Sequence, residues 1–168
     1  DSLAKDGITF KKAYTPCALC TPARTSLLTG LSPHNHGALY NSGCHLPFSI
    51  DNIGQGLIHL TDYLKQANYQ MGYAGKWHLG TAATAADLNF EGFGPKGYGD
   101  VRKSSQYLDY LKKNNLAFPE VEIEFQANQS IGNSSGFLKG EKESTDTFFV
   151  ASEVKNLINK FSKQENPF

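Results

Sequence analysis

Residues 20–30, CTPARTSLLTG, combine a cysteine, a proline, an arginine and a closing glycine in one short stretch. Pro22 suits the first turn of a helix, because the N–H that proline lacks would have no partner there. Gly30 follows an apolar run and is typical of the residue that ends a helix. The stretch therefore predicts a helix that starts at Pro22 and ends before Gly30, with Cys20 just ahead of its first turn.

The position of Cys20 suits a nucleophile that attacks an anion. The start of a helix presents unpaired backbone N–H groups and the positive end of the helix dipole, which together bind sulfate or phosphate groups. Arg24, one turn further on, can present paired donors to a tetrahedral oxyanion. The spacing therefore indicates attack on a sulfuryl or phosphoryl group. Two plainer interpretations stay open: a buried structural cysteine, or one half of a Cys17–Cys20 pair.

A second candidate segment is GYAGKWHLG, residues 72–80. Apolar residues at helical spacing over 57–67 predict an amphipathic helix, and 69–76 is predicted to be the strand that follows it. The segment then lies at the carboxyl end of a strand, where ligand sites collect in open α/β sheets. Lys76 and His78 would point to one side of an extended chain and supply a cation and a proton donor or acceptor. A surface lysine and a loop histidine are the plain alternative.

Together, CTPARTSLLTG and GYAGKWHLG resemble the two signature regions of the type I sulfatases, which belong to the alkaline-phosphatase-like superfamily. The resemblance implies that Cys20 is converted after translation to formylglycine, an aldehyde whose hydrate is the nucleophile. It also implies that Arg24 steadies the modified residue, that Lys76 holds the sulfate and that His78 hydrogen-bonds the hydrate. Ala23 departs from the serine that is most frequent in the family motif.

The same resemblance implies a metal and partners. One divalent cation, usually calcium in the family, would be bound by the formylglycine made from Cys20 and by Asp and Asn side chains outside residues 1–168. The substrate would be a sulfate monoester, either an aryl sulfate or a sulfated glycan. A formylglycine-generating enzyme would act during maturation. The residues themselves do not indicate a compartment, and the family resemblance implies the periplasm, secretion or the lysosome.

We expect residues 1–168 to be part of a sulfatase N-terminal catalytic domain, because both ends look cut. The expected fold is α/β: an alkaline-phosphatase-like, mixed and mostly parallel sheet flanked by helices, present as a partial domain. A hard cation binds about six oxygen ligands, and the family resemblance implies that most of them lie outside residues 1–168. The segment alone is therefore expected to be inactive and unstable.

Further elements follow from the periodicity of apolar residues and from turn-forming residues. Expected strands cover 7–14 and 120–125, expected loops cover 31–55 and 81–100, and expected helices cover Lys103–Asn114 and Thr147–Phe161. Phe10 and Tyr14 are expected in the core. The apolar stripe of the last helix consists of Phe148, Ala151, Val154, Ile158 and Phe161.

Composition narrows the function classes. The 168 residues include 16 Lys plus Arg and 16 Asp plus Glu, so the formal net charge is zero and offers no cationic surface for nucleic acid. No apolar run approaches the ~20 residues of a membrane span. Three cysteines are too few for a disulfide framework.

Four other functions stay open. A structural zinc site could draw on the soft ligands Cys17, Cys20, His34, His36, Cys44 and His45. A redox dithiol could use Cys17 and Cys20, although Pro22 places the helix start after both. A phosphodiesterase or phosphonate monoester hydrolase would use the same nucleophile, because a phosphate diester is also a singly charged tetrahedral centre. A non-catalytic protein would keep Cys20 as a thiol.

Overall fold

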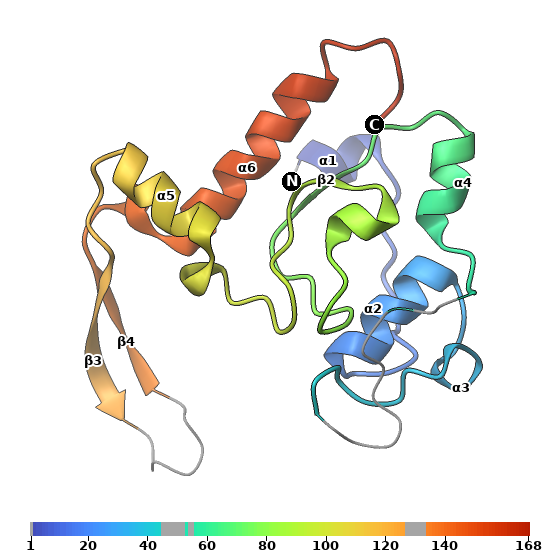
Figure 1. Ribbon diagram of the computed structural model, residues 1–168, viewed down its shortest axis with the longest axis horizontal. Helices are drawn as coiled ribbons and strands as arrows, with labels where there is room; N and C mark the ends of the chain where they lie inside the picture. The colour runs from blue at the N-terminus through green and yellow to red at the C-terminus, as the bar shows by residue number, and fades with distance from the viewer. Residues whose placement is uncertain (1, 45–52, 54–55, 127–133) are drawn as a thin grey trace.

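The computed structural model describes residues 2–44, 53, 56–126 and 134–168 (Figure 1). The α-helices are α1 (Ser2–Asp6), α2 (Cys20–Thr29), α3 (Pro33–His36), α4 (Leu60–Gln66), α5 (Ser105–Lys113) and α6 (Asp146–Phe161). The strands are β1 (Gly72–Ala74), β2 (Glu91–Phe93), β3 (Glu120–Gln126) and β4 (Ser134–Lys139). Short 3-10 helices are η1 (Ala85–Leu88), η2 (Val101–Lys103) and η3 (Lys142–Ser144). No helix in these described ranges is both long and apolar enough to cross a membrane.

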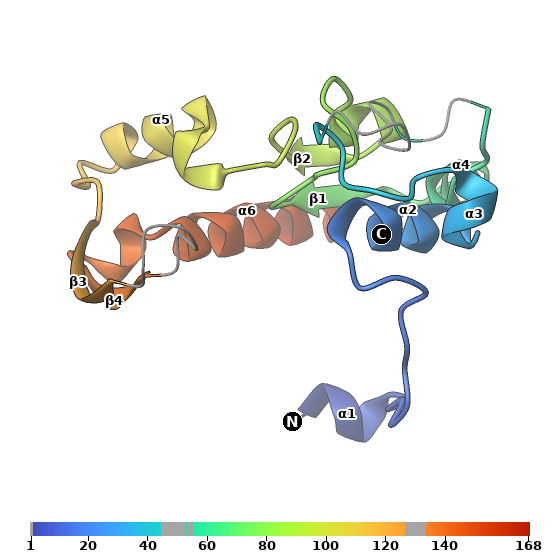
Figure 2. The ribbon, with the colours of Figure 1, turned by 90° about the horizontal axis from the view of Figure 1, so that it is seen from below.

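A short parallel pair, β1 with β2, lies near the centre of the molecule, and α6 packs along it (Figure 2). Gly72 lies opposite Glu91 in the register of the pair. Gly92 has a φ of 109°, and a Cβ there would lie 2.4 Å from the carbonyl oxygen of Tyr73, so only glycine fits. A Cβ at Gly72 would meet the Phe161 ring at 3.0 Å. Glycine in both strands therefore allows the close packing of β1, β2 and α6.

The buried apolar side chains form two clusters. One surrounds the fully buried Trp77 and contains Ile53, Leu79, Ala85 and Leu88. The other joins β2, α5 and α6 through Phe93, Tyr107, Leu111 and Phe149. Because Trp77 and Leu79 belong to the first cluster, the core holds the backbone on both sides of His78 and fixes the segment that follows β1.

The two ends of the molecule differ in structure. The antiparallel hairpin of β3 and β4 lies at one end, whereas α2, α3 and α4 gather at the other (Figure 1). β3 confirms the strand predicted over 120–125, and α5 and α6 confirm the last two predicted helices. The helix predicted from Pro22 is confirmed as α2, which begins at Cys20.

The strand predicted over 7–14 is wrong. These residues are irregular chain after α1, and Figure 2 shows that α1 is set apart from the main body, which the chain then joins at α2. Phe10 and Tyr14 are 78% and 88% exposed, so their predicted place in the core is wrong as well. Alternating residues supply only a tendency to form a strand, which also needs a hydrogen-bonding strand alongside. None of the described residues provides that strand here.

The two predicted loops contain regular structure. α3 lies within 31–55, and η1 and β2 lie within 81–100. Residues 45–52, 54 and 55 of the first loop lie outside the described chain. These elements are too short to show an apolar period, and a glycine interrupts β2, so the sequence patterns that predict helices and strands miss them.

The helix and strand predicted between residues 57 and 76 are shorter than expected. The helix predicted over 57–67 begins only at Leu60, where the backbone N–H of His59 donates to the Asp62 carboxylate at 2.8 Å. The strand predicted over 69–76 is reduced to β1. A φ of 124° at Gly75 turns the chain out of the extended conformation, so Lys76 follows the strand rather than ending it.

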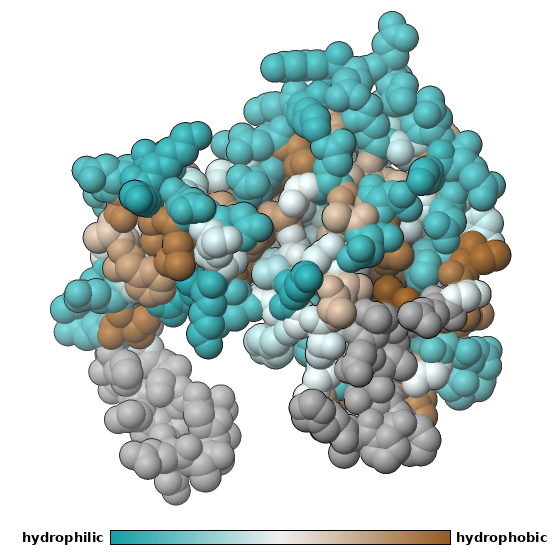
Figure 3. All heavy atoms as spheres, in the orientation of Figure 1, coloured by the Kyte–Doolittle hydropathy of each residue, from teal (hydrophilic) through white to brown (hydrophobic). Residues whose placement is uncertain are grey.

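The predicted apolar stripe of α6 is only partly buried. Phe161 is buried, but the stripe members Phe148, Val154 and Ile158 are exposed. Phe149, outside the stripe, is buried, and its ring centroid lies 5.1 Å from that of Phe93. Apolar side chains therefore reach the molecular surface in several places, as Figure 3 illustrates for one face. Periodicity identifies the helix, whereas packing selects the face that is buried.

Candidate active site

Helix α2 places Cys20 at its first residue. Leu19, just before it, is extended, with φ −123° and ψ 141°, and its carbonyl accepts a hydrogen bond from the Ala23 N–H at 3.0 Å. Pro22 is buried in the first turn, and Gly30 ends the helix with a φ of 70°. Cys20 is a half-buried free cysteine. It therefore lies at the helix terminus that favours an anion, as predicted.

Thr21 attaches the start of α2 to the segment that follows β1. Its buried hydroxyl donates to the carbonyl of His78 at 2.9 Å and accepts from the Ser42 N–H at 3.1 Å. The Thr21 N–H, a donor that the helix start leaves without a helical partner, binds Asn41 Oδ1 at 3.0 Å. Segments far apart in sequence are thus joined at the residue next to Cys20.

Arg24 binds the backbone of the same segment. Its Nη1 donates to the carbonyl of Lys76 at 2.8 Å and lies 3.4 Å from the carbonyl oxygen of Trp77. The same nitrogen lies 3.2 Å from the hydroxyl of Tyr73, which itself donates to the Lys76 carbonyl. The described contacts of Arg24 are therefore made through Nη1 with backbone carbonyls and a tyrosine hydroxyl. Its predicted support of the modified residue 20 stays a prediction.

Lys76 reaches Cys20 directly. Its Nζ lies 4.0 Å from Cys20 Sγ and 3.7 Å from the centroid of the Tyr98 ring. Within the described residues, no Asp or Glu forms an ion pair with Lys76. The ammonium charge is therefore not neutralised by a neighbouring carboxylate and can act on an anion beside Cys20.

His78 lies two residues further on and is 3% exposed. Its φ of 54° shows that the backbone is not extended, so the simple alternation expected for Lys76 and His78 is wrong. The Nδ1 atom has no hydrogen-bond partner among the described residues, and the ring centroid lies 5.1 Å from that of Tyr98. Burial lowers the pKa of His78; the charges of Lys76 and Arg24 lower it further, while a backbone hydrogen bond opposes them. The neutral form of the His78 imidazole is thus favoured, and its buried Nδ1 is left without a partner among the described residues.

Two tyrosines belong to the site without having been predicted from the sequence. Tyr73 on β1 contacts Arg24, and Tyr98 contacts both Lys76 and His78. Tyr98 lies in the stretch predicted as a loop, where aromatic residues have no period to reveal them. The signal that could have found it is the pair of glycines on either side, since both adopt positive φ values.

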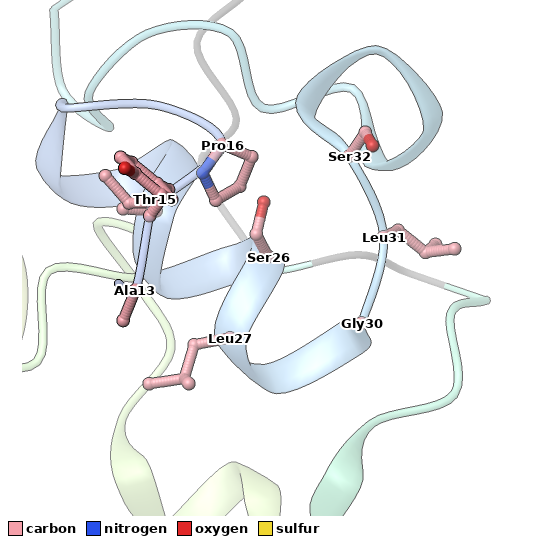
Figure 4. Close-up of a pocket in the computed structure, with 10 residues that line it drawn as sticks. Ala13, Thr15, Pro16, Ser26, Leu27, Gly30, Leu31 and Ser32 are labelled. Carbon is pink, nitrogen blue, oxygen red and sulfur yellow. The ribbon is translucent and has the colours of Figure 1, made fainter. Parts of the chain in front are cut away.

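The surface beside Cys20 is hollowed. An open pocket of about 630 Å³ is lined by Cys17, Cys20 and Arg24 together with apolar side chains of α2 and the chain before it. Figure 4 shows a second pocket, of about 490 Å³, whose lining includes Ser26 and Leu27 and contains no charged side chain. The second pocket offers only uncharged hydroxyl donors, whereas the pocket beside Cys20 also offers the positive charge of Arg24, which suits a sulfate. The pocket with Cys20 and Arg24 is therefore the candidate site.

The residues around Cys20 do not by themselves fit a calcium ion. In the described ranges, no three His, Cys, Asp or Glu side chains gather as a metal site. Calcium wants at least six oxygen ligands, and Cys20, once modified, is the one ligand predicted in this chain. The remaining ligands were predicted to lie outside it.

The soft ligands proposed for zinc do not gather either. His36 Nε2 lies 2.9 Å from Ser26 Oγ, and its Nδ1 accepts from the Ala38 N–H at 3.1 Å, so both ring nitrogens have protein partners. The three cysteines are free, and His45 lies outside the described chain. The described structure therefore offers no support for a zinc module.

Helices alternate with strands along the chain, and a helix terminus that carries Cys20 lies beside a lysine that follows a parallel strand, so the protein is of the α/β class. The crystal structure of Ps i-CgsB has this fold: its TM-score is 0.59 at 22% identity, over 92% of this chain and 34% of that one. The crystal structure of its complex with k-i-k-neocarrahexaose gives a TM-score of 0.60 over the same shares. The predicted fold class is confirmed. The model of the Sulfatase family matches residues 1–164, and the chain belongs to that family.

Similar relatives come from animals and bacteria. Arylsulfatase A of Bos taurus is 41% identical over 88 residues, which are 52% of this chain and 17% of that protein. The N-acetylgalactosamine-6-O-sulfatase of Bacteroides thetaiotaomicron is 40% identical over 80 residues, 48% of this chain and 15% of that protein. Arylsulfatase of Hemicentrotus pulcherrimus is 32% identical over 80 residues, 48% of this chain and 14% of that protein. The matches thus span less than a fifth of the length of these relatives.

Proposed function

We propose that this chain forms the nucleophile-bearing part of a sulfatase that hydrolyses a sulfate monoester. The observation that carries the proposal is the approach of Lys76 Nζ to Cys20 Sγ, 4.0 Å, at the first residue of α2. The sulfur stands where the first oxygen of a formylglycine side chain would lie. Membership in the sulfatase family supports the same reaction.

Each predicted residue has its own task in this proposal. Lys76 offers its positive charge to the sulfate oxygens. His78, whose neutral form burial favours, would hydrogen-bond the hydroxyl of residue 20 or the oxygen of the leaving alcohol through Nδ1, the buried nitrogen without a partner in the described chain. Arg24 holds the backbone of Lys76 and so fixes that residue relative to α2. Charges held in place before the reaction usually supply the largest part of catalysis.

Residue 20 in this proposal is formylglycine made by a formylglycine-generating enzyme, and its hydrate supplies the attacking hydroxyl and a second hydroxyl that allows sulfate to leave. A divalent cation, calcium in the family pattern, would be held by this residue with ligands from outside residues 1–168. The substrate is an aryl sulfate or a sulfated glycan. The proposed compartment is the periplasm, the lysosome or the outside of the cell, and residues 1–168 are proposed as part of an N-terminal catalytic domain.

The experiment that tests the proposal uses the natural protein purified from its host. Conversion of Cys20 should lower the mass of its peptide by about 18 Da, because an aldehyde oxygen replaces the thiol. Fragment ions should assign the loss to residue 20 and leave Cys17 unchanged. An unmodified Cys20 would instead support a non-catalytic protein.

The modified protein should then hydrolyse an aryl sulfate faster than an aryl phosphodiester. Lys76→Ala should lower kcat/KM on the sulfate by about a hundredfold, because it removes a charge from the site. Lys96→Ala removes an exposed lysine and serves as the matched control, with kcat/KM within about twofold of the wild type. Faster hydrolysis of the aryl phosphodiester would instead indicate a phosphodiesterase or phosphonate monoester hydrolase.

A further inference from the structure

Tyr98 lies between the two predicted functional groups of the segment that follows β1. Its ring centroid is 3.7 Å from Lys76 Nζ and 5.1 Å from the centroid of the His78 ring. We infer that Tyr98 is a positioning residue, which holds the Lys76 ammonium beside residue 20, covers His78 and so sets how tightly an anionic substrate binds. The catalytic meaning of this inference rests on the proposed function, whereas the effect on Lys76 rests on the contacts alone.

An aromatic ring such as that of Tyr98 is a suitable contact for Lys76, because the ammonium has to remain free to bind an anion. Lys76 has a long flexible stem and needs a contact that keeps its ammonium near Cys20. A carboxylate would do this but would also cancel the charge, and none pairs with Lys76 in the described chain. The face of an aromatic ring attracts a cation without carrying a net charge. Lys76 is thus oriented while its positive charge stays available to sulfate.

The loop around Tyr98 is built to lie on the backbone of Lys76. Gly97 and Gly99 adopt φ values of 62° and 77°. A Cβ at Gly99 would lie 3.1 Å from the Trp77 backbone nitrogen and 3.3 Å from Lys76 Cα, so a larger residue would push the loop away. Trp77 is held in its core cluster, which fixes the backbone that Gly99 contacts. The close approach of Gly99 to this backbone places the neighbouring Tyr98 ring over Lys76.

Tyr98 is also placed so that its removal can be tested. It is 68% exposed and is not a member of either core cluster. Its replacement should therefore leave the fold intact, and a change in substrate binding would not reflect unfolding. The matched control is Tyr63 on α4, which is 58% exposed and is likewise outside both core clusters.

The experiment compares Tyr98→Leu, Tyr98→Phe and the control Tyr63→Leu in the natural, modified protein. Tyr98→Leu should raise KM for an aryl sulfate about three- to thirty-fold, because it removes the aromatic face that orients Lys76. Tyr98→Phe retains the ring and should bring KM back to within about twofold of the wild type. Tyr63→Leu should behave like the wild type, and all variants should unfold at similar temperatures. A KM of Tyr98→Leu equal to the wild type would overturn the role in substrate binding.

A second measurement needs no turnover. With limiting acetylating reagent, peptide mass spectrometry gives the rate of acetylation of Lys76 relative to Lys96. The ring covers one side of the Lys76 amine and shields it from the reagent, so Tyr98→Leu should raise this ratio about threefold or more and Tyr98→Phe should not. An unchanged ratio in Tyr98→Leu would refute the contact itself. If the wild type hydrolyses no sulfate ester, the proposed function fails, and the acetylation ratio still decides whether Tyr98 positions Lys76.

Discussion

Lys76 and His78 are two residues apart yet have opposite surroundings. The ammonium of Lys76 is half-exposed beside Cys20, while the imidazole of His78 is buried and held neutral. The backbone at His78 takes a positive φ, and Trp77 between them is anchored in the core. One short segment therefore supplies a charged group beside Cys20 and a buried imidazole whose neutral form is favoured.

At the scale of single residues, His36 offers a prediction about pH. The imidazole is buried, and this burial is the main cause that lowers the pKa of His36 below its ordinary value of 6.5, with a smaller contribution from His34. The unfolded chain therefore takes up a proton before the folded protein does as the pH falls. The free energy of unfolding should be constant above about pH 7 and should decrease as the pH drops below 6.5.

Urea unfolding between pH 8 and pH 5 measures this dependence. His36→Gln should reduce the slope, and the slope that remains should include that of His78, whose pKa is also lowered. His34→Gln replaces an exposed histidine and should leave most of the slope in place. A protein that gained stability on acidification would show that His36 is charged in the fold.

At the scale of elements, α2 depends on hydrogen bonds that its own sequence does not contain. The buried Thr21 hydroxyl donates a hydrogen bond to the His78 carbonyl and accepts one from the Ser42 N–H. The Arg24 guanidinium donates further hydrogen bonds to the backbone carbonyls of Lys76 and Trp77. The orientation of α2, and with it the direction of Cys20, is therefore set by the segment after β1 more than by contacts within the helix.

A pair of matched substitutions tests this dependence. Thr21→Val retains the shape of the side chain but leaves two buried backbone groups without partners, so it should destabilise the protein by about 2–4 kcal/mol. Thr61→Val on α4 is the control, because the Thr61 hydroxyl is buried without a partner in the described structure. It should change stability by less than about 0.5 kcal/mol or increase it. Equal losses in the two variants, measured by urea unfolding, would contradict the assignment.

At the scale of the whole molecule, the buried core is small and much apolar surface is exposed. Ile8, Phe10 and Tyr14 are exposed in the chain before α2, and Phe148 and Ile158 are exposed on α6. Large exposed apolar patches mark interaction surfaces or sites of aggregation. This exposed apolar surface predicts that residues 1–168 associate when they are expressed alone.

We predict that residues 1–168 expressed alone hydrolyse no aryl sulfate and associate as their concentration rises. Light scattering measures the association, and a chromogenic aryl sulfate measures turnover. The natural protein, assayed in parallel, should be active and should scatter less light. Turnover by the isolated segment at a rate near that of the natural protein would contradict this prediction.

Much of the fold and part of the site follow from local patterns. Pro22 and Gly30 mark the ends of α2, and the periodicity of α6 predicts that helix, because both signals depend on neighbours within a few residues. The prediction of a strand over 7–14 was wrong, because a strand needs a neighbouring strand to hydrogen-bond with, and the periodicity of one segment does not show whether that neighbour exists. The sequence does not predict Tyr98 as a site residue, because Tyr98 lies in a loop that contacts Lys76 only after the chain has folded.

The sequence by itself determined which chemical groups this protein offers: a cysteine at a helix start, with Arg24, Lys76 and His78 within two short motifs. Only the tertiary structure decided how they are used. It brought Lys76 to Cys20, directed Arg24 to backbone carbonyls and buried His78 under Tyr98. The physical reason is that helix ends and residue types are set by local geometry, whereas distances, burial and charge neutralisation depend on segments that meet only after folding.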